Sequence, residues 1–468
     1  MNATPVPPAP ASRRAASRAI GSARLVAAAP ASGRQLLRWL AVHGLVRLAS
    51  RRWAASGDPQ AMLIADPASR LDPRPVYRRI RAAGPLCRTR VSLITVDHAI
   101  CQQVLRAEEF RTTSLAGNVP PPMQWLERRT RQLSLHPLQA PSLLVVEPPE
   151  HTRYRTLVSS VFTARAVAGL RERVQLTADR LLDELAEPAE RGATVELVSR
   201  YCAQLPVSVI GDILGVPVDQ RSTVLHFGEL AAPSLDIGLP LGQFRTVERG
   251  LAGFDRWLTG HIDRLRRQPG TDLLSQLIQA RSDGQALDEL ELRATAGLLL
   301  AAGFETTVNL LSNGVHLLAR QPDQLAVLRA EPGHWPNAVD EILRLESPVQ
   351  LTARVARQAI MLADQQVQQG ETVVLVLAGA NRDPAVFADP DRFDVTRANA
   401  ARHLSFSGGR HFCLGAALAR AEGEIGLRSL FQRYPGLALA GAPVSRPTRV
   451  LRGWQQLPVR LADPAAPR

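Results

Sequence analysis

Phe406-Ser-Gly-Gly-Arg-His-Phe-Cys413-Leu-Gly415 is the stretch of sequence whose chemistry decides the fold. The glycines at 408 and 409 allow a tight backbone turn and a close approach to a flat partner. A helix is predicted from Leu414 to about Tyr434, so that Cys413 stands directly before it. The free N–H groups and positive dipole end of a helix stabilise a thiolate. The loop therefore predicts a metal-ligating thiolate, and an inert buried cysteine is the alternative.

The same stretch resembles the haem-binding loop of the cytochrome P450 family. An aromatic residue, glycines, a basic residue, cysteine and glycine recur there at this spacing, and Ser407 stands where bacterial members more often carry glycine. The resemblance implies that Cys413 ligates the iron of haem b. It also implies haem contacts from four other residues of the loop, which are Phe406, Gly408, His411 and Gly415.

A second motif, Ala302-Gly303-Phe304-Glu305-Thr306-Thr307, lies midway along a helix predicted from Asp288 to about Arg320. This helix is apolar on most faces, so we expect it to be buried in the middle of the protein. The resemblance implies that the motif forms the oxygen-activation groove above the haem. Ala302 and Gly303 would lie against the cofactor, and Thr306 and Glu305 would pass protons.

A third motif, Glu341-Ile-Leu-Arg344, matches the E-x-x-R pair of the family. Residues three apart share one helix face, so the two side chains can pair. The resemblance implies a third partner before the cysteine loop, for which Arg397 is the best match and Arg392 the alternative. We expect a structural role, namely a buried charge network that locks the scaffold of the loop.

His151 and Arg155 follow a helix-start pattern and share one face at a spacing of four residues. In bacterial members of the family such a pair binds a haem propionate. Arg354 and His411 match further propionate contacts, and a guanidinium suits a carboxylate because it offers two parallel hydrogen bonds.

Helical patterns dominate the chain, with a further helix predicted at Trp335–Leu345 and strands at Ala359–Leu362 and Thr372–Leu377. The fold class is therefore mainly α with a small β region. The resemblance, which spans about residues 59–460, implies the triangular helical prism of the family, with haem between the long central helix and the helix after the cysteine loop. Residues 59–468 are predicted to form a single monooxygenase domain.

The N-terminal region differs from the rest in composition. Residues 1–57 contain nine arginines and no acidic residue, and the chain has no lysine. Residues 1–33 are rich in Ala, Pro, Ser and Arg, which predicts disorder. Residues 34–58 form a basic apolar segment that is too short to span a bilayer. We interpret this region as a dispensable tail, with a membrane-surface helix at 34–56 or a transit peptide as alternatives.

Composition also excludes several functions. Without lysine, neither a phosphate-binding loop of the G-x-x-x-x-G-K type nor a Schiff-base enzyme can form. Outside the N-terminal region the net charge is modest, so nucleic-acid binding is not expected. The four cysteines, Cys87, Cys101, Cys202 and Cys413, form no C-x-x-C pair, which is typical of a reducing compartment such as the cytoplasm. We expect no transmembrane segment.

The predicted function is a monooxygenase that inserts one atom of O2 into a hydrophobic small molecule. The chain has no G-x-G-x-x-G fingerprint and no residues left for a flavin domain, so a ferredoxin and its ferredoxin reductase are the expected electron donors. Arg155 and Arg410 are predicted to attract the acidic ferredoxin. A haem-binding gas or redox sensor and a peroxide-driven enzyme are the alternatives. The resemblance assigns substrate contacts to residues 113–146, 225–250, 297–306, 349–353 and 446–456, among which Pro120–Pro122, Met123 and Trp125 are apolar.

Overall fold

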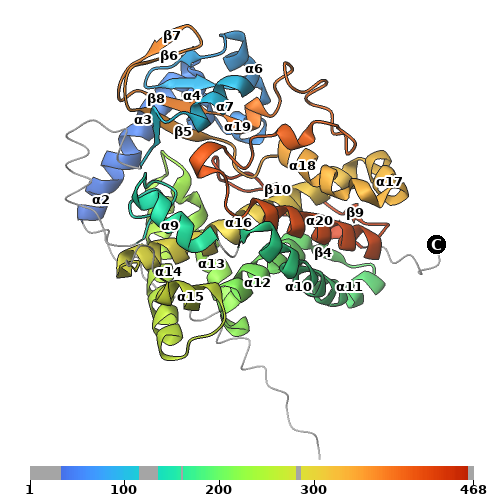
Figure 1. Ribbon diagram of the computed structural model, residues 1–468. Coiled ribbons are helices and arrows are strands. Elements are labelled where there is room, and N and C mark those ends of the chain that lie inside the picture. The colour runs from blue at the N-terminus through green and yellow to red at the C-terminus, as the bar shows by residue number, and fades with distance from the viewer. Residues whose placement is uncertain (1–32, 115–134, 160–161, 281–285, 462–468) are drawn as a thin grey trace, which may run out of the picture.

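A computed structural model describes residues 33–114, 135–159, 162–280 and 286–461 of the chain. Helices form most of it, and a small mixed sheet with α4, α6 and α7 occupies one end (Figure 1). The predicted class, mainly α with a small β region, is confirmed. The substrate contacts predicted at Pro120–Pro122, Met123 and Trp125 lie outside the described residues, as do residues 1–32 of the segment 1–33 predicted to be disordered.

The α-helices, in chain order, are α2 (Gly33–Trp39), α3 (Leu45–Ala55), α4 (Pro59–Ala65), α5 (Pro67–Leu71), α6 (Arg74–Ala82), α7 (His98–Arg106), α9 (Glu150–Ser159), α10 (Ala164–Asp183), α11 (Ala186–Glu190), α12 (Gln204–Ile213), α13 (Arg221–Ala231), α14 (Leu241–Arg267), α15 (Leu273–Gln279), α16 (Glu289–Arg320), α17 (Pro322–Ala330), α18 (Trp335–Leu345), α19 (Leu377–Ala380) and α20 (Ala416–Arg433). The strands are β1 (Cys87–Arg88), β2 (Leu93–Thr95), β3 (Phe110–Thr112), β4 (Thr194–Glu196), β5 (Thr352–Ala356), β6 (Ile360–Leu362), β7 (Gln365–Val367), β8 (Thr372–Leu375), β9 (Ala438–Leu439), β10 (Val444–Ser445), β11 (Trp454–Gln456) and β12 (Pro458–Arg460).

The ends of the long helix α16 are set by a capping box at its start and a proline after its last turn. Asp288 and Glu291 form a capping box, in which each side chain accepts a hydrogen bond from the other residue's backbone N–H. Pro322 follows the last turn and starts α17. Among the described residues, α16 is the one helix long and apolar enough to span a membrane, but two-thirds of its apolar window (67%) is buried inside the protein. It is therefore the core helix that the sequence predicts.

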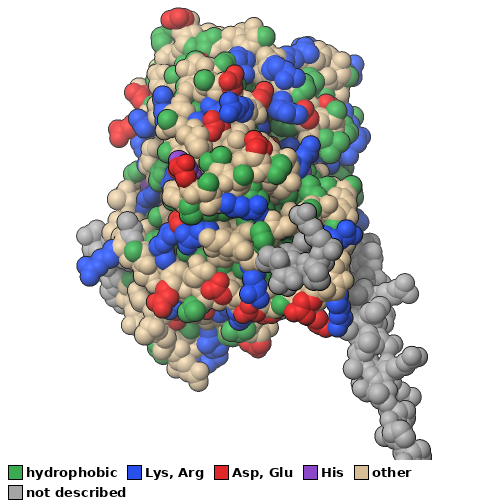
Figure 2. All heavy atoms as spheres, turned by 90° about the vertical axis from the view of Figure 1, so that its right-hand side faces the viewer, with side chains coloured by type: hydrophobic (Ala, Val, Ile, Leu, Met, Phe, Trp, Pro, Cys, Tyr) green, Lys and Arg blue, Asp and Glu red, His purple; other side chains and the backbone are tan. Residues whose placement is uncertain are grey.

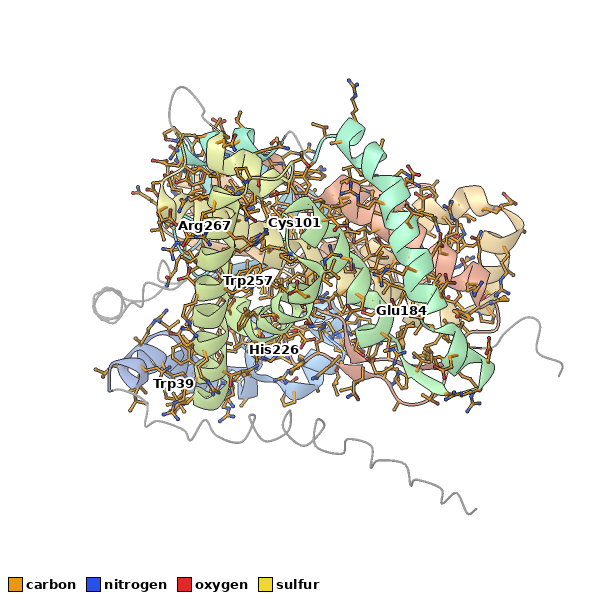
Figure 3. All side chains as sticks on the ribbon, turned by 90° about the horizontal axis from the view of Figure 1, so that it is seen from below. Trp39, Cys101, Glu184, His226, Trp257 and Arg267 are labelled. Carbon is orange, nitrogen blue, oxygen red and sulfur yellow. The ribbon has the colours of Figure 1, made fainter. Side chains whose placement is uncertain are left out.

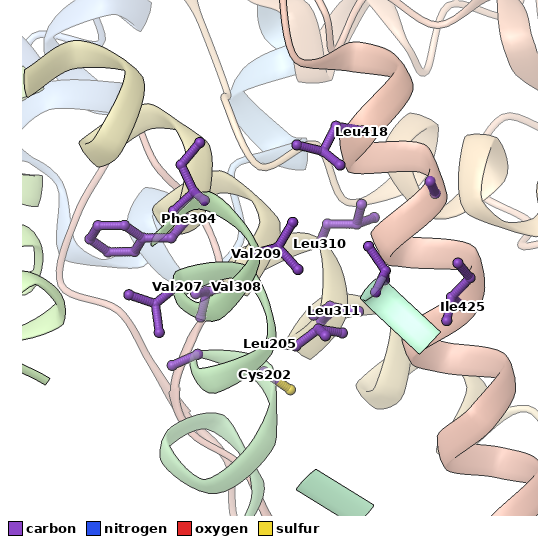
Figure 4. Close-up of a cluster of buried hydrophobic side chains, with 14 of the residues drawn as sticks. Cys202, Leu205, Val207, Val209, Phe304, Val308, Leu310, Leu311, Leu418 and Ile425 are labelled. Carbon is purple, nitrogen blue, oxygen red and sulfur yellow. The ribbon is translucent and has the colours of Figure 1, made fainter. Parts of the chain in front are cut away.

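The centre of the core lies where α12, α16 and α20 meet. Figure 4 shows Leu205 and Val209 of α12, Val308 and Leu311 of α16, and Ile425 of α20 facing one another. Since side chains here are almost fully buried, a volume change at this junction is felt by three helices at once. This packing fixes α16 relative to the N-terminal end of α20, where the cysteine loop lies.

The main sheet has five strands in the order β1-β2-β8-β5-β3. β2 pairs with β8 in parallel, and β5 pairs with both β8 and β3 in antiparallel register. β6 and β8 lie within the two predicted strands, and Gly370 adopts φ +84° in the turn between them. The sheet positions Arg354, which is on β5 opposite Val373.

Two predictions about helices need correction. α20 begins at Ala416, and Gly415 is its N-cap, so Cys413 stands three residues before the helix rather than directly before it. The segment after residue 33 is not a dispensable tail, because α2, a π-helical turn (Leu40–Gly44) and α3 pack against the body of the protein. Arg38 is 3% exposed and forms an ion pair of 2.6 Å with the buried Glu248 of α14.

Candidate haem-thiolate site

The cysteine loop is held by its own backbone. The Cys413 N–H donates a hydrogen bond of 2.9 Å to the Phe406 carbonyl, which closes the loop into a compact turn. The Cys413 side chain is accessible to solvent. The surrounding protein nevertheless removes enough water from the sulfur to raise the pKa of its thiol. A hydrogen bond from the Gly415 N–H and the charges of Arg155 and Arg420 act in the opposite direction and favour the thiolate.

The glycines of this loop lie against α7. Gly409 has φ +63°, and a Cβ there would lie 2.2 Å from the Leu105 carbonyl oxygen at the end of α7. Gly408 likewise faces Leu105. The predicted tight turn is confirmed, and the missing side chains also let the loop pack closely on α7. Ser407 also adopts a left-handed φ of +62°, which explains why glycine is favourable at this position.

On α16, the residues of the oxygen-groove motif point in different directions. Ala302 is exposed in the middle of this buried helix, and the Thr306 hydroxyl donates a hydrogen bond of 2.8 Å to the Ala302 carbonyl. Gly303 points elsewhere, because a Cβ on it would lie 2.8 Å from Cγ1 of Ile210 in α12. The lack of a side chain at Gly303 therefore has a structural reason within the protein itself. Its small size lets α12 pack closely on α16.

Glu305 has a partner that sequence reasoning missed. Its carboxylate is 4% exposed and forms an ion pair with Arg446, which adjoins the strand β10. Burial raises the pKa of Glu305, and the charge of Arg446 opposes the rise. The second carboxylate oxygen, Oε2, is buried and has no hydrogen-bond partner among the described residues. Arg446 was predicted near this site only as part of the substrate-contact range 446–456.

Three basic side chains, those of His151, His411 and Arg354, gather where a dianionic group could be held. The His151 and His411 rings are 4.4 Å apart, and the Nε2 atom of each is buried without a hydrogen-bond partner among the described residues. Burial lowers the pKa of His151 to about 4 and that of Arg354 to about 10. Within the described part of the chain, Arg354 donates only to Thr352 and to the Ala353 carbonyl. An anion here would relieve the desolvation of all these groups.

Glu147, four residues before His151, is the acid beside this cluster. Its carboxylate accepts hydrogen bonds from Thr112 and Arg357 and lies 3.3 Å from Arg410 and 3.8 Å from His411. Burial acts to raise the pKa of Glu147, but the hydrogen bonds outweigh it and hold the pKa well below its usual range. Arg410 is therefore committed to an internal pair, and Arg155 donates to the Phe412 carbonyl at 2.9 Å.

The E-x-x-R pair forms a buried network with Arg397. The Glu341 carboxylate accepts from Nε of Arg344 at 2.7 Å, from Nη2 of Arg344 at 2.8 Å and from Nε of Arg397 at 3.1 Å. Arg392 contributes its backbone carbonyl to both arginines rather than its side chain. These bonds join α18 to the chain that leads into the cysteine loop.

These features fit a haem. Cys413 and Ala302 are both accessible although their elements meet in the centre of the molecule, and the buried imidazoles of His151 and His411 and the guanidinium of Arg354 lie near the loop as donors for propionates. An accessible cysteine before a helix, an accessible small residue on the central helix and basic side chains near the cysteine loop are the parts that a haem-thiolate protein requires.

The chain belongs to the cytochrome P450 family, whose model matches residues 254–334 and 335–442. It is 58% identical over 428 residues to the "Putative cytochrome P450 140" of Mycobacterium tuberculosis, which covers 91% of this chain and 97% of that one. It is 42% identical to the 6-deoxyerythronolide B hydroxylase of Saccharopolyspora erythraea over 67% of this chain and 76% of that one. The structure of epothilone D-bound cytochrome P450epoK matches with a TM-score of 0.75 and 31% identity, over 85% of this chain and 98% of that one. The chain is thus a haem-dependent monooxygenase of the bacterial type.

Proposed function

We propose that Cys413 would hold the haem iron as a thiolate ligand, and that the enzyme inserts one oxygen atom from O2 into a hydrophobic small molecule. The single observation that carries this proposal is the accessible Cys413 sulfur in front of α20, with the Gly415 N–H directed at it. When bound, the haem supplies the activation of dioxygen and the transfer of the oxygen atom. The protein supplies the ligand, the orientation of the substrate and the protons.

The basic cluster would hold the propionates of the haem. His151 and His411 offer their buried Nε2 atoms, and Arg354 and Arg155 offer guanidinium N–H groups. A bound carboxylate would raise the pKa of both histidines from their lowered values, because the opposite charge favours the imidazolium. The haem would also be contacted from the loop that presents Cys413, by Phe406, Gly408 and Gly415. On its other side it would be contacted from α16, by Ala302 and Gly303.

Protons would reach the reaction through Glu305 and Thr306. The Thr306 hydroxyl, anchored on the Ala302 carbonyl, can orient a water next to the reacting oxygen. Glu305 lies on the other side of the helix turn, where Arg446 holds one carboxylate oxygen and leaves Oε2 free to exchange a proton. The network of Glu341, Arg344 and Arg397 has a structural role in this scheme.

Electrons would come from a ferredoxin that is reduced by a ferredoxin reductase. Phe412, which precedes the ligand, is 42% exposed and offers an approach to the loop. Arg155 is partly exposed beside it and can attract an acidic partner, whereas Arg410 is engaged by Glu147. The free state of all four cysteines is in keeping with a cytoplasmic location.

The test of ligation is the absorption spectrum of the reduced, carbon monoxide-bound protein beside that of Cys413→Ser. We expect the strongly red-shifted Soret band of a thiolate complex in the wild type and its loss in the variant. A band typical of histidine ligation in the wild type would overturn the proposal. Thr306→Ala should keep the band but divert electrons from product, and tight coupling in that variant would refute the proton role.

A further inference from the structure

Several polar side chains of α2 and of the π-helical turn Leu40–Gly44 point inward, whereas leucines of α2, the turn and α3 are exposed. Arg38 pairs with Glu248, Trp39 donates from Nε1 to the Leu239 carbonyl at 2.9 Å, and the His43 ring lies 5.3 Å from that of Phe244. Figure 3 shows Trp39 beside the end of α14 that is remote from Arg267. The large apolar side chains left in solvent on these helices are Leu36, Leu37, Leu40, Leu45 and Leu48.

This exposed face continues across three other segments. Arg47 donates to the Gly238 carbonyl at 3.1 Å, which joins α3 to the loop between α13 and α14. Arg449 donates to the neighbouring Ile237 carbonyl at 3.3 Å. Arg452 donates to the Leu71 carbonyl of α5 at 3.1 Å. These bonds bring together segments that each carry an exposed apolar side chain, with Leu48 68%, Leu71 67% and Ile237 38% exposed.

The same face carries an excess of positive charge. Burial lowers the pKa of Arg47, and the nearby charges of Arg51 and Arg70 lower it further. Arg449 is affected in the same way, by burial first and then by Arg70 and Arg47, against the opposing charge of Asp236. Asp236 is itself buried and accepts from the backbone N–H groups of Arg449 and Val450. Asp72, at the end of α5, is paired with Arg74.

We propose that this face, made of Leu45, Leu48, Leu71 and Ile237 with Arg47, Arg51, Arg70 and Arg449, binds the surface of an anionic phospholipid bilayer. Aliphatic side chains among arginines are the composition that enters the headgroup region, where leucine leaves water and guanidinium meets phosphate. A second copy of the chain is disfavoured as the occupant, because a two-fold contact would place the arginines against one another. The side of the molecule turned away from α2 and α3 shows acidic and basic side chains interspersed (Figure 2).

The helical periodicity of the segment does not show this face, because its arginines and leucines are not separated around the helix. The tertiary contacts separate them. Arg38 points inward to Glu248, and Arg47 points toward the loop at Gly238. The surface that these two arginines leave is rich in exposed leucines. The inference is independent of how the haem site works.

The test is co-sedimentation of the haem-loaded full chain with vesicles of phosphatidylcholine alone or mixed with phosphatidylglycerol. We expect binding to the mixed vesicles only, and weakening as salt rises from ~0.1 M to ~1 M. Leu45→Gln/Leu48→Gln should bind at least about tenfold more weakly because two apolar anchors are lost. Arg51→Gln should bind about fivefold more weakly, the usual effect of one arginine at an anionic surface. The control, Leu176→Gln/Arg173→Gln on α10, removes an equally exposed pair elsewhere and should bind as the wild type does.

Three results would overturn the proposal. Equal binding to both kinds of vesicle would remove the role of charge. Unchanged binding by Leu45→Gln/Leu48→Gln would place the contact elsewhere, for example at the arginines of residues 1–32. A dimer in analytical ultracentrifugation that dissociates in this variant would show that a second copy covers the face. Haem content and circular dichroism establish that each variant is folded.

Discussion

Replacing Glu341 by glutamine is the perturbation whose outcome follows most directly from the structure. The carboxylate is fully buried and faces the guanidinium of Arg344, which is 0% exposed, and that of Arg397, which is 9% exposed. The backbone N–H of Asp394 also donates to it at 3.0 Å. Glutamine keeps the shape but removes the negative charge that two buried cations share. Its NH2 group also cannot accept one of these bonds.

The expected cost is about 3–5 kcal/mol of unfolding free energy, the usual penalty for leaving a buried charge without its partner. Arg344 makes the penalty hard to avoid, because its other N–H groups already donate to the carbonyls of Asn381, Pro390 and Arg392. The guanidinium cannot turn to water without breaking these bonds. The chain from 388 to 397 should loosen with it, and haem retention should fall.

Urea denaturation followed by tryptophan fluorescence, together with the haem-to-protein ratio, measures both effects. The matched control is Glu184→Gln, which breaks the Arg180–Glu184 pair whose side chains are each 55% exposed. Exposed pairs contribute little, so less than about 0.5 kcal/mol should be lost in the control. A loss below about 1 kcal/mol in Glu341→Gln, with normal haem content, would refute the reasoning about this network.

Three further predictions concern packing, backbone strain and pH. Gly303→Ala should lower stability by about 1–2 kcal/mol, since its Cβ would meet Ile210 at 2.8 Å, and Ile210→Ala should suppress the added clash in a double-mutant cycle. Ser407→Gly should raise the unfolding free energy by up to about 1 kcal/mol because it relieves φ +62°, and an unchanged urea midpoint would contradict this. Burial, and then Arg38, lower the pKa of His43 from 6.5 to about 4, so its docking is stable above pH 6.5 and weakens as the pH falls toward 4. Hydrogen exchange of residues 33–55 should therefore show about 2 kcal/mol less protection at pH 5 than at pH 7, and His43→Gln should remove most of that difference.

Much of the candidate site could be predicted because its motifs are local. Each motif depends on residues within one turn or one helix, as in the cysteine loop, the E-x-x-R pair and the His151–Arg155 pair. The helices α16 and α18 could be predicted from their apolar periodicity and capping residues. Helix boundaries near Cys413 were less certain, because Gly415 could be either part of the helix or its cap.

Other features depend on contacts between residues far apart in the sequence. Arg446 reaches Glu305 across 141 positions and Glu248 reaches Arg38 across 210, and no local pattern links either pair. The sequence also does not show which neighbour requires glycine at positions 303 and 409, because a missing side chain accommodates any close neighbour. Only the packing shows that these neighbours are Ile210 and Leu105. The sequence by itself therefore determined the ligand chemistry and the helical class, because both are properties of short segments. The tertiary structure alone decided which buried charges meet and which leucines face solvent, because both depend on how distant segments pack.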